Sequence, residues 1–323
     1  MKKSMLSKLT SVSTILAMSG FIFAGCGSSS SDTTPPATTE KSVAIDFRSI
    51  VGTQGDVTCS ENNVTKIYTG LGNTTANGTI ADFRYFISEV KLKMSDGTTK
   101  DLVMTNNDNQ YQNDVNGSVA LLDFEDATGD CTGRGNSVET YKTIIGTINS
   151  SASISGLEFT IGVPLALNHV EFPAIKALTA TSMAWSWASG RKFTKLEVNP
   201  VDSNNTTGDI FNFHLGSTGC SDSNADGITD NCLQPNRVKL VFDNFNPATQ
   251  KIVLDYSKLL THVDITTDAG GAKGCMSGLT DPECMSTTGK MFNVIGLDDA
   301  GIQGTCIAGD CTLNQQLFSV ESK

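Results

Sequence analysis

Residues 86–94 read FISEVKLKM, and this stretch decides the fold class. Phe86, Val90, Leu92 and Met94 fall on one side of an extended chain, with polar residues between them. The same period of two returns in GLEFTIGV (156–163), KFTKLEV (192–198), IFNFHL (210–215), RVKLVF (237–242) and KIVLDY (251–256). Polar turns separate these segments, and DYSKLLTHV (255–263) is the best short helix candidate. We therefore predict an all-β fold, an antiparallel β-sandwich of Greek-key or immunoglobulin-like type with long disulfide-closed loops.

The start of the chain has the pattern of a lipoprotein signal peptide over residues 1–25. A basic start and a short apolar run lead to FAGC, the form of a lipobox, so Cys26 is predicted to be lipidated. Ordinary signal cleavage, with Cys26 left as a free thiol, is the alternative. Residues 26–43 are small, polar and proline-containing, which indicates a disordered tether. Residues 44–323 show no second linker, so a single domain is predicted there.

The chain is acidic, with a formal net charge of −11. Loss of the signal-peptide lysines Lys2, Lys3 and Lys8 makes the charge −14. This acidity argues against nucleic acid as a partner, because nucleic-acid binding depends on Lys and Arg contacts to phosphate. It mildly favours metal ions or cationic partners. We expect an outer-membrane lipoprotein, in the periplasm or at the cell surface, that meets the membrane only through its anchor.

The cysteine count indicates disulfides. Without Cys26, eight of the nine cysteines remain, and an even number in an exported chain predicts four disulfides. The sequence alone does not choose among the possible pairings. Local spacing favours Cys220–Cys232, Cys275–Cys284 and Cys306–Cys311, which leaves Cys59–Cys131. No C-x-x-C-H motif occurs, so the chain carries no c-type haem of its own.

Conventional catalysis is not indicated. The chain has no G-x-S-x-G nucleophile elbow, and the even cysteine count leaves no obvious nucleophilic thiol. Asp123 and Glu125 in ALLDFED are most simply the polar end of a strand. We predict that the protein is not an enzyme.

Three histidines are the best candidates for transition-metal ligands: His169, His214 and His262. A lone histidine is more often a surface or hydrogen-bonded residue than a ligand. In IFNFHL, however, the apolar residues alternate inward, so His214 shares the opposite face with Asn212. It also lies at a strand end just before a predicted disulfide loop, which is a suitable place for a ligand.

The segment TSMAWSWASGRKF (181–193) holds both tryptophans, Trp185 and Trp187. Met183 alternates with them, so a strand would project all three side chains from one face. On periodicity alone, a core position or a stacked surface ladder is the simplest interpretation.

The segment DSNADGITD (222–230) follows the first part of an EF-hand-type calcium loop. The possible calcium ligands are Asp222, Asn224, Asp226, Asp230 and the backbone carbonyl of Ile228. Leu233 stands where the bidentate glutamate would be expected. The alternative is a polar turn rich in Asp and Asn for conformational reasons.

Taken together, these segments resemble the MbnP-like copper-binding proteins, the four-Cys-motif members of the metallo-mystery pair. The matching segments are DFRYFISEVKL (82–92), ALLDFED with Cys131 (120–131), FTIGVPLALNH (159–169), SMAWSWASGRKF (182–193), FHLGSTGC (213–220) and NRVKLVFDNF (236–245). The combination of LNH, M-x-W-x-W-x-x-G-x-K-F and FHLGSTGC is far more specific than any single piece. Arg191 departs from the family pattern, which usually has tyrosine there.

The resemblance implies copper bound by His169 and His214. It also implies a partner, a di-haem enzyme of the cytochrome c peroxidase and MauG type, which converts a tryptophan to kynurenine as a further ligand. Trp185 or Trp187 would be the oxidised residue, and His262 lies outside the matching motifs. The characteristic cysteines would be Cys59, Cys131, Cys220 and Cys232, with Cys275 and Cys284 as a further pair.

The expected function is therefore copper acquisition, storage or handover by an exported, lipid-anchored protein. Copper affinity should fall below about pH 6.5, because ligand histidines must be neutral. Two alternatives remain. One is a structural or adhesive surface lipoprotein with a calcium loop, and the other is an electron relay to the di-haem partner.

Overall fold

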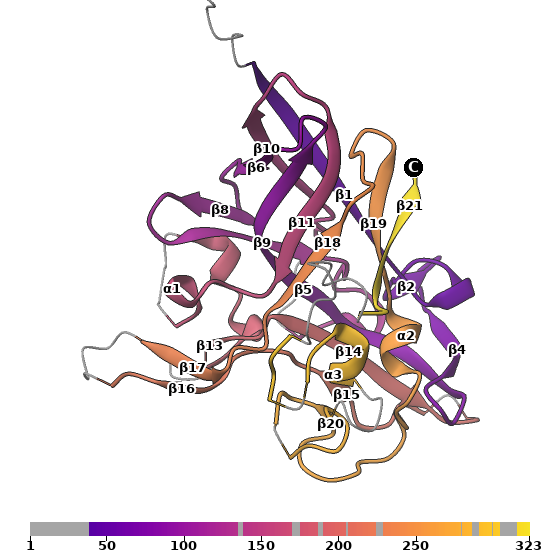
Figure 1. Cartoon of the computed structure of the whole chain (residues 1–323). Helices are drawn as coiled ribbons and strands as arrows, with labels where there is room; N and C mark the ends of the chain where they lie inside the picture. Colours follow the sequence, from indigo (N-terminus) through magenta and orange to yellow (C-terminus); the bar gives the residue numbers. More distant parts are fainter. Residues whose placement is uncertain are drawn as a thin grey trace, which may run out of the picture. The chain divides into compact units, whose positions relative to one another are not determined.

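The structure is a computed structural model that describes residues 39–134, 138–169, 175–186, 190–204, 206–223, 229–278, 280–285, 291–298, 300–303 and 315–323. Two large sheets dominate this part of the chain (Figure 1). The smaller sheet has the order β21 (Phe318–Ser322), β19 (Gln250–Asp255), β1 (Glu40–Ile50), β10 (Thr143–Asn149) and β7 (Val103–Met104). β1 begins earlier than the predicted domain start at residue 44.

The larger sheet is organised around one long strand, β5 (Ala76–Met94). Its main path is β18 (Val238–Phe242), β11 (Ile154–Ile161), β5, β14 (Thr194–Val201), β15 (Phe211–Phe213) and β20 (Gly274–Cys275). Four further strands extend it: β4 (Ile67–Leu71), β6 (Thr99–Asp101), β8 (Gln110–Asn113) and β9 (Gly117–Asp123). Pairing is antiparallel except between β1 and β19 and between β15 and β20.

Short elements complete the described fold. Three two-stranded hairpins are formed by β2 (Ser60–Glu61) with β3 (Val64–Thr65), β12 (Ala184–Ser186) with β13 (Gly190–Arg191), and β16 (Thr218–Ser221) with β17 (Asn231–Gln234). The helices are α1 (Leu165–Asn168), α2 (Tyr256–Leu260) and α3 (Met291–Ile295), with 3-10 turns η1 (Gly52–Gln54), η2 (Gly129–Cys131), η3 (Lys176–Leu178) and η4 (Thr181–Met183). α2 lies within the predicted helix segment. No helix in the described ranges is long and apolar enough to span a membrane.

Aromatic side chains join the two large sheets into a sandwich. Phe47 of β1 makes an edge-to-face contact with Phe159 of β11, at a centroid distance of 5.7 Å. Phe318 of β21 contacts Phe159 at 6.0 Å and Tyr85 of β5 at 6.1 Å. All four rings are buried, and burial of such large apolar surfaces is the main stabilising term of the fold. The predicted all-β sandwich is confirmed.

A bulge in β5 overturns one detail of the sequence prediction. Ile87 pairs with Ile161 and Leu92 pairs with Leu157, so β5 has one residue more than β11 between these pairs. Glu89 has the positive φ of 54° in this interval. The extra residue exchanges the two faces, so Ile87, not Phe86, lies on the face of Leu92. The prediction that Phe86 shares that face was wrong because period-two counting cannot detect a bulge.

The structure forms three of the four predicted disulfides. Cys59–Cys131 joins residues that are 72 positions apart, Cys220–Cys232 crosslinks the β16–β17 hairpin, and Cys275–Cys284 closes a short loop after β20. The fourth predicted pair, Cys306–Cys311, lies outside the described residues, as does Cys26.

Candidate metal centre

His214 follows β15, and strand register decides what it faces. Leu196 pairs with Phe213 and Glu197 pairs with Asn212, so His214 projects from the same face as Glu197 and Asn212, as the alternation in IFNFHL predicted. His214 Nε2 lies 2.7 Å from Glu197 Oε1. The side chain is buried, with 4% of the residue exposed. Its Nδ1 has no hydrogen-bond partner among the residues that the structure describes.

The backbone around His214 is held on both sides. His214 N donates a hydrogen bond to Cys275 O at 2.9 Å. Ser277 Oγ donates to His214 O at 2.9 Å and accepts from Gly216 N at 3.0 Å. The loop closed by Cys275–Cys284 therefore fixes the position of the histidine.

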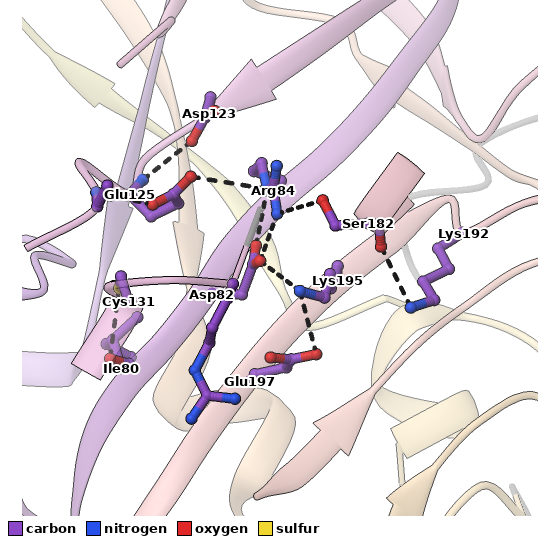
Figure 2. A network of polar contacts seen from close by, with 12 residues as sticks. Ile80, Asp82, Arg84, Asp123, Glu125, Cys131, Ser182, Lys192, Lys195 and Glu197 are labelled. Atoms are coloured by element: carbon purple, nitrogen blue, oxygen red, sulfur yellow. Dashed lines mark hydrogen bonds and ion pairs between the residues drawn. The ribbon is translucent and has the colours of Figure 1, made fainter. Parts of the chain in front are cut away.

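Glu197 belongs to a buried network of charges on this face of the sheet (Figure 2). Asp82 pairs with Glu197 and Arg84 pairs with Lys195 in the β5–β14 register, which brings all four charged side chains to one side. Arg84 donates to Asp82 from Nε at 2.8 Å and from Nη2 at 2.5 Å. Lys195 Nζ lies 2.5 Å from Asp82 Oδ2 and 3.4 Å from Glu197 Oε1. Each buried charge thus has a partner of opposite sign.

The environment favours an ionised Glu197 and a neutral His214. Burial alone would raise the pKa of Glu197, but the hydrogen bond with His214 and the charge of Lys195 lower it to about 2. Burial lowers the pKa of His214, and the nearby Lys192 and Lys195 lower it further. The hydrogen bond with Glu197 acts in the opposite direction, but it is outweighed. Neutral imidazole is the form that binds a metal.

His169 lies directly after α1, and it is also buried. Its Nε2 is 2.9 Å from Asn168 Nδ2 and 3.7 Å from Cys232 Sγ. Asn168 Oδ1 accepts a hydrogen bond from Arg191 N at 2.8 Å, which orients the amide so that its NH₂ group faces the imidazole. A Cβ at Gly190 would lie 2.7 Å from Asn168 Nδ2, so glycine is required for this contact. His169 is thus tied to both the β12–β13 and β16–β17 hairpins.

Trp185 lies in β12, half-buried, against the segment that follows His214. A Cβ at Gly216 would lie 2.4 Å from Trp185 Cζ3 and 2.6 Å from Cη2, so the indole occupies the space that a side chain at Gly216 would need. The turn before β12 is joined to the charged network, because Arg84 Nη2 donates to Ser182 Oγ at 2.9 Å and Lys192 Nζ donates to Ser182 O at 3.2 Å. The geometry therefore brings Trp185 beside the backbone two residues after His214.

Other predicted site residues do not join this cluster or lie outside the described ranges. His262 is exposed, in the loop after α2. Trp187 and the possible calcium ligands Asn224, Asp226 and Ile228 lie outside the described residues. Of the remaining calcium candidates, Asp222 is half-buried and Asp230 Oδ2 accepts a hydrogen bond from Ser223 N at 2.8 Å. The calcium loop remains a prediction.

Cysteine sulfur is excluded as a thiolate ligand beside His169. The ligand atoms of His169, Cys220 and Cys232 lie within 4.8 Å of one another. The two cysteines, however, form a disulfide, and a disulfide sulfur lacks the negative charge that makes thiolate a strong ligand. Their role is to hold the β16–β17 hairpin beside His169.

The charged network was not predicted from the sequence. Its signal is present as D-x-R (82–84) and K-x-E (195–197), in which charges occupy alternate positions of otherwise apolar strands. A charge at a position that the strand period places inside the fold is costly, and it is usually paired or functional. This rule could have drawn attention to Glu197.

Comparisons with known proteins agree with this arrangement. The MbnP family model matches residues 40–277. The solved structure of MbnP from Methylosinus trichosporium is similar to this chain, with 30% sequence identity and a TM-score of 0.69. The match covers 88% of this chain and 99% of that one. No match was found among functionally curated proteins. From the family match and this structural similarity, we conclude that the chain belongs to the MbnP family.

Proposed function

We propose that this protein is an exported, lipid-anchored copper carrier whose site combines His169 and His214 with a tryptophan oxidised to kynurenine. Copper would be acquired, stored or handed over in the periplasm or at the cell surface. The chain would be the substrate of a di-haem, MauG-like partner rather than an enzyme itself.

The observation that carries the proposal is the buried Nδ1 of His214, which has no hydrogen-bond partner among the described residues and lies two residues before Gly216, on which Trp185 packs. A buried nitrogen lone pair without a hydrogen bond is uncommon in folded proteins, and it calls for an explanation such as an ion. Imidazole suits copper, which outranks the other divalent first-row metals at nitrogen sites. The donor set of this chain therefore fits the metal.

Trp185 is supported as the modified residue by its packing on Gly216. The lone pair of an indole nitrogen belongs to the aromatic system, so intact tryptophan is a poor ligand. Conversion to kynurenine adds two oxygen atoms across the C2–C3 bond of the indole, and hydrolysis then releases the C2 carbon as formate. The net change replaces one carbon by one oxygen and frees an aryl amine, which can coordinate. The oxidising equivalents would come from the di-haem partner, so only protein matured with that partner should hold the full site.

His169 would contribute through Nε2, the nitrogen that faces Asn168 and Cys232. Coordination there requires that the Asn168 amide give up its hydrogen bond to the ring. The proposal therefore includes a small local movement at the end of α1, next to residues 170–174, which lie outside the described ranges.

Metal analysis of protein produced together with its partner tests the proposal. His214→Ala and His169→Ala should each lose most of the bound copper, while the exposed His262→Ala should retain it. Unchanged copper content in His214→Ala would refute the site.

A second measurement addresses the modification. Mass spectrometry of the tryptic peptide that begins at Ala177 covers both tryptophans. One of them should carry the carbon-for-oxygen exchange, and fragmentation would locate it. Two intact tryptophans in partner-matured protein would count against the proposal and favour a structural or electron-relay role.

A further inference from the structure

We propose that Glu197 is a positioning residue that locks His214 in the tautomer with hydrogen on Nε2, which makes Nδ1 the metal-binding atom. This inference rests on the proposed copper function and assigns the ligating nitrogen within it.

Glu197 determines which nitrogen of His214 carries the proton. Glu197 Oε1 is 2.7 Å from His214 Nε2. The same oxygen lies 3.4 Å from Lys195 Nζ, and Lys195 also contacts Asp82. A carboxylate paired with an ammonium group can only accept hydrogen bonds. The hydrogen of this bond therefore belongs to the imidazole, on Nε2.

The other ring nitrogen, Nδ1, is left with a free lone pair. With hydrogen on Nε2, the Nδ1 of a neutral imidazole is a lone-pair acceptor. Within the described part of the chain this Nδ1 is buried and accepts no hydrogen bond. Turning the ring about its Cβ–Cγ bond would move Nε2 away from Glu197, break the 2.7 Å bond and leave the carboxylate without that donor.

The hydrogen bond between Glu197 and His214 is held rigidly by its surroundings. Glu197 and Asn212 form a register pair, and His214 directly follows β15, with its N–H bonded to Cys275 O, so the backbone at both ends of the hydrogen bond is held. Lys195 contacts the carboxylate from the other side, Asp82 contacts Lys195, and Arg84 contacts Asp82. Histidines that bind metals generally donate a hydrogen bond from their other ring N–H to a carboxylate or carbonyl, which fixes the ring and raises the basicity of the ligating nitrogen. Glu197 stands in this position.

A purely structural role for the pair is the competing explanation. In that case Glu197 would only balance the charges of Lys195 and the network, and the tautomer of His214 would not matter to metal binding. The two explanations differ in what a glutamine at position 197 should do. Glutamine keeps the size of the side chain, but it can either accept from the ring or donate to it.

The test combines nitrogen NMR with copper titration. In the metal-free wild-type protein, labelled with ¹⁵N-histidine, His214 should show a protonated Nε2 and an unprotonated Nδ1. His169→Ala and His262→Ala assign the signals, because the chain has three histidines. Glu197→Gln should show both tautomers and a copper Kd raised by roughly 10–100-fold.

Glu158→Gln is the matched control. Glu158 is also a strand glutamate in the larger sheet and also contacts two lysines, Lys239 at 2.7 Å and Lys93 at 3.6 Å. Its replacement should leave the copper Kd and the His214 spectrum at their wild-type values.

Each outcome bears on a different claim. The inference is overturned if His214 of the wild-type protein is protonated at Nδ1. This measurement needs no variant at position 197. Wild-type affinity in Glu197→Gln also overturns the inference. Partner-matured wild-type protein that binds no copper removes the proposed function itself, whereas copper binding that depends on His214 but not on Glu197 removes only this inference.

Discussion

The strands β5, β14 and β15 present two faces of opposite character. On one face, Phe83, Leu196 and Phe213 share register pairs and are fully buried among apolar neighbours. The residues directly before or after these three project from the other face: Asp82, Arg84, Lys195, Glu197 and His214, also buried. Both faces exclude water, but only burial of the apolar face stabilises the fold by itself.

The difference shows where specificity lies in this fold. A buried ion pair contributes little net stability, because desolvation of the charges offsets their attraction. The charged face instead fixes side-chain orientation, because each charged group orients the next one, from Arg84 to His214. The apolar face stabilises the sheet that keeps the charged face in register.

The largest effect is expected from the apolar face. Phe83→Ala should lower the free energy of unfolding by about 3–5 kcal/mol, because a fully buried ring that contacts Phe124 and Tyr256 is lost and a cavity remains. Urea denaturation measures this loss, and Phe83→Leu should lose clearly less. A loss below about 1 kcal/mol would mean that the site collapses easily and that the apolar face is not the main support.

A somewhat smaller effect is expected from the charged face. Asp82→Asn removes the carboxylate that Arg84 and Lys195 share. It should lower the free energy of unfolding by about 3 kcal/mol. This is the low end for a broken buried ion pair, because the amide oxygen of asparagine still accepts hydrogen bonds. A double-mutant cycle with Arg84→Met checks the coupling by denaturation. The double variant should lose less than the sum of the single variants; strict additivity would show that the pair is not coupled.

The smallest minimum effect on the free energy of unfolding is expected at Asp123, and it depends on pH. Burial, together with the charge of the nearby Glu125, raises the pKa of Asp123 to about 7, against 3.8 for an ordinary aspartate. Between these values the folded state binds more protons than the unfolded chain, so the free energy of unfolding falls as the pH rises. Asp123→Asn removes this cost, and it should be more stable than wild type at about pH 8 by at least about 1 kcal/mol, since one pKa unit corresponds to about 1.4 kcal/mol.

The advantage of Asp123→Asn should disappear at about pH 4, where wild-type Asp123 is protonated in the folded state. Denaturation curves at the two pH values measure the difference. An equal effect at both would show that the carboxylate is ionised in the folded protein. The contribution of Glu197 depends on pH in the opposite direction. Its lowered pKa adds stability that is lost as the pH falls from about 4.5 toward about 2.

Much of the fold could be predicted because strand alternation is a local property. The segments around residues 86–94, 156–163, 192–198 and 237–242 all correspond to strands. The face of Phe86 was predicted wrongly, because the bulge at Glu89 depends on how β5 pairs with β11. The match to the MbnP family confirms the resemblance drawn from LNH, the tryptophan segment and FHLGSTGC.

The sequence by itself determined the fold class, the family and the alternation that turns His214 away from Phe213, because each follows from residue types at short spacing. Only the tertiary structure decided that Glu197 meets His214, that Asp82 and Arg84 stand behind it, and that Trp185 packs on Gly216. These contacts join strands and hairpins distant in the chain. Register and packing, rather than local propensity, set the distances between such atoms.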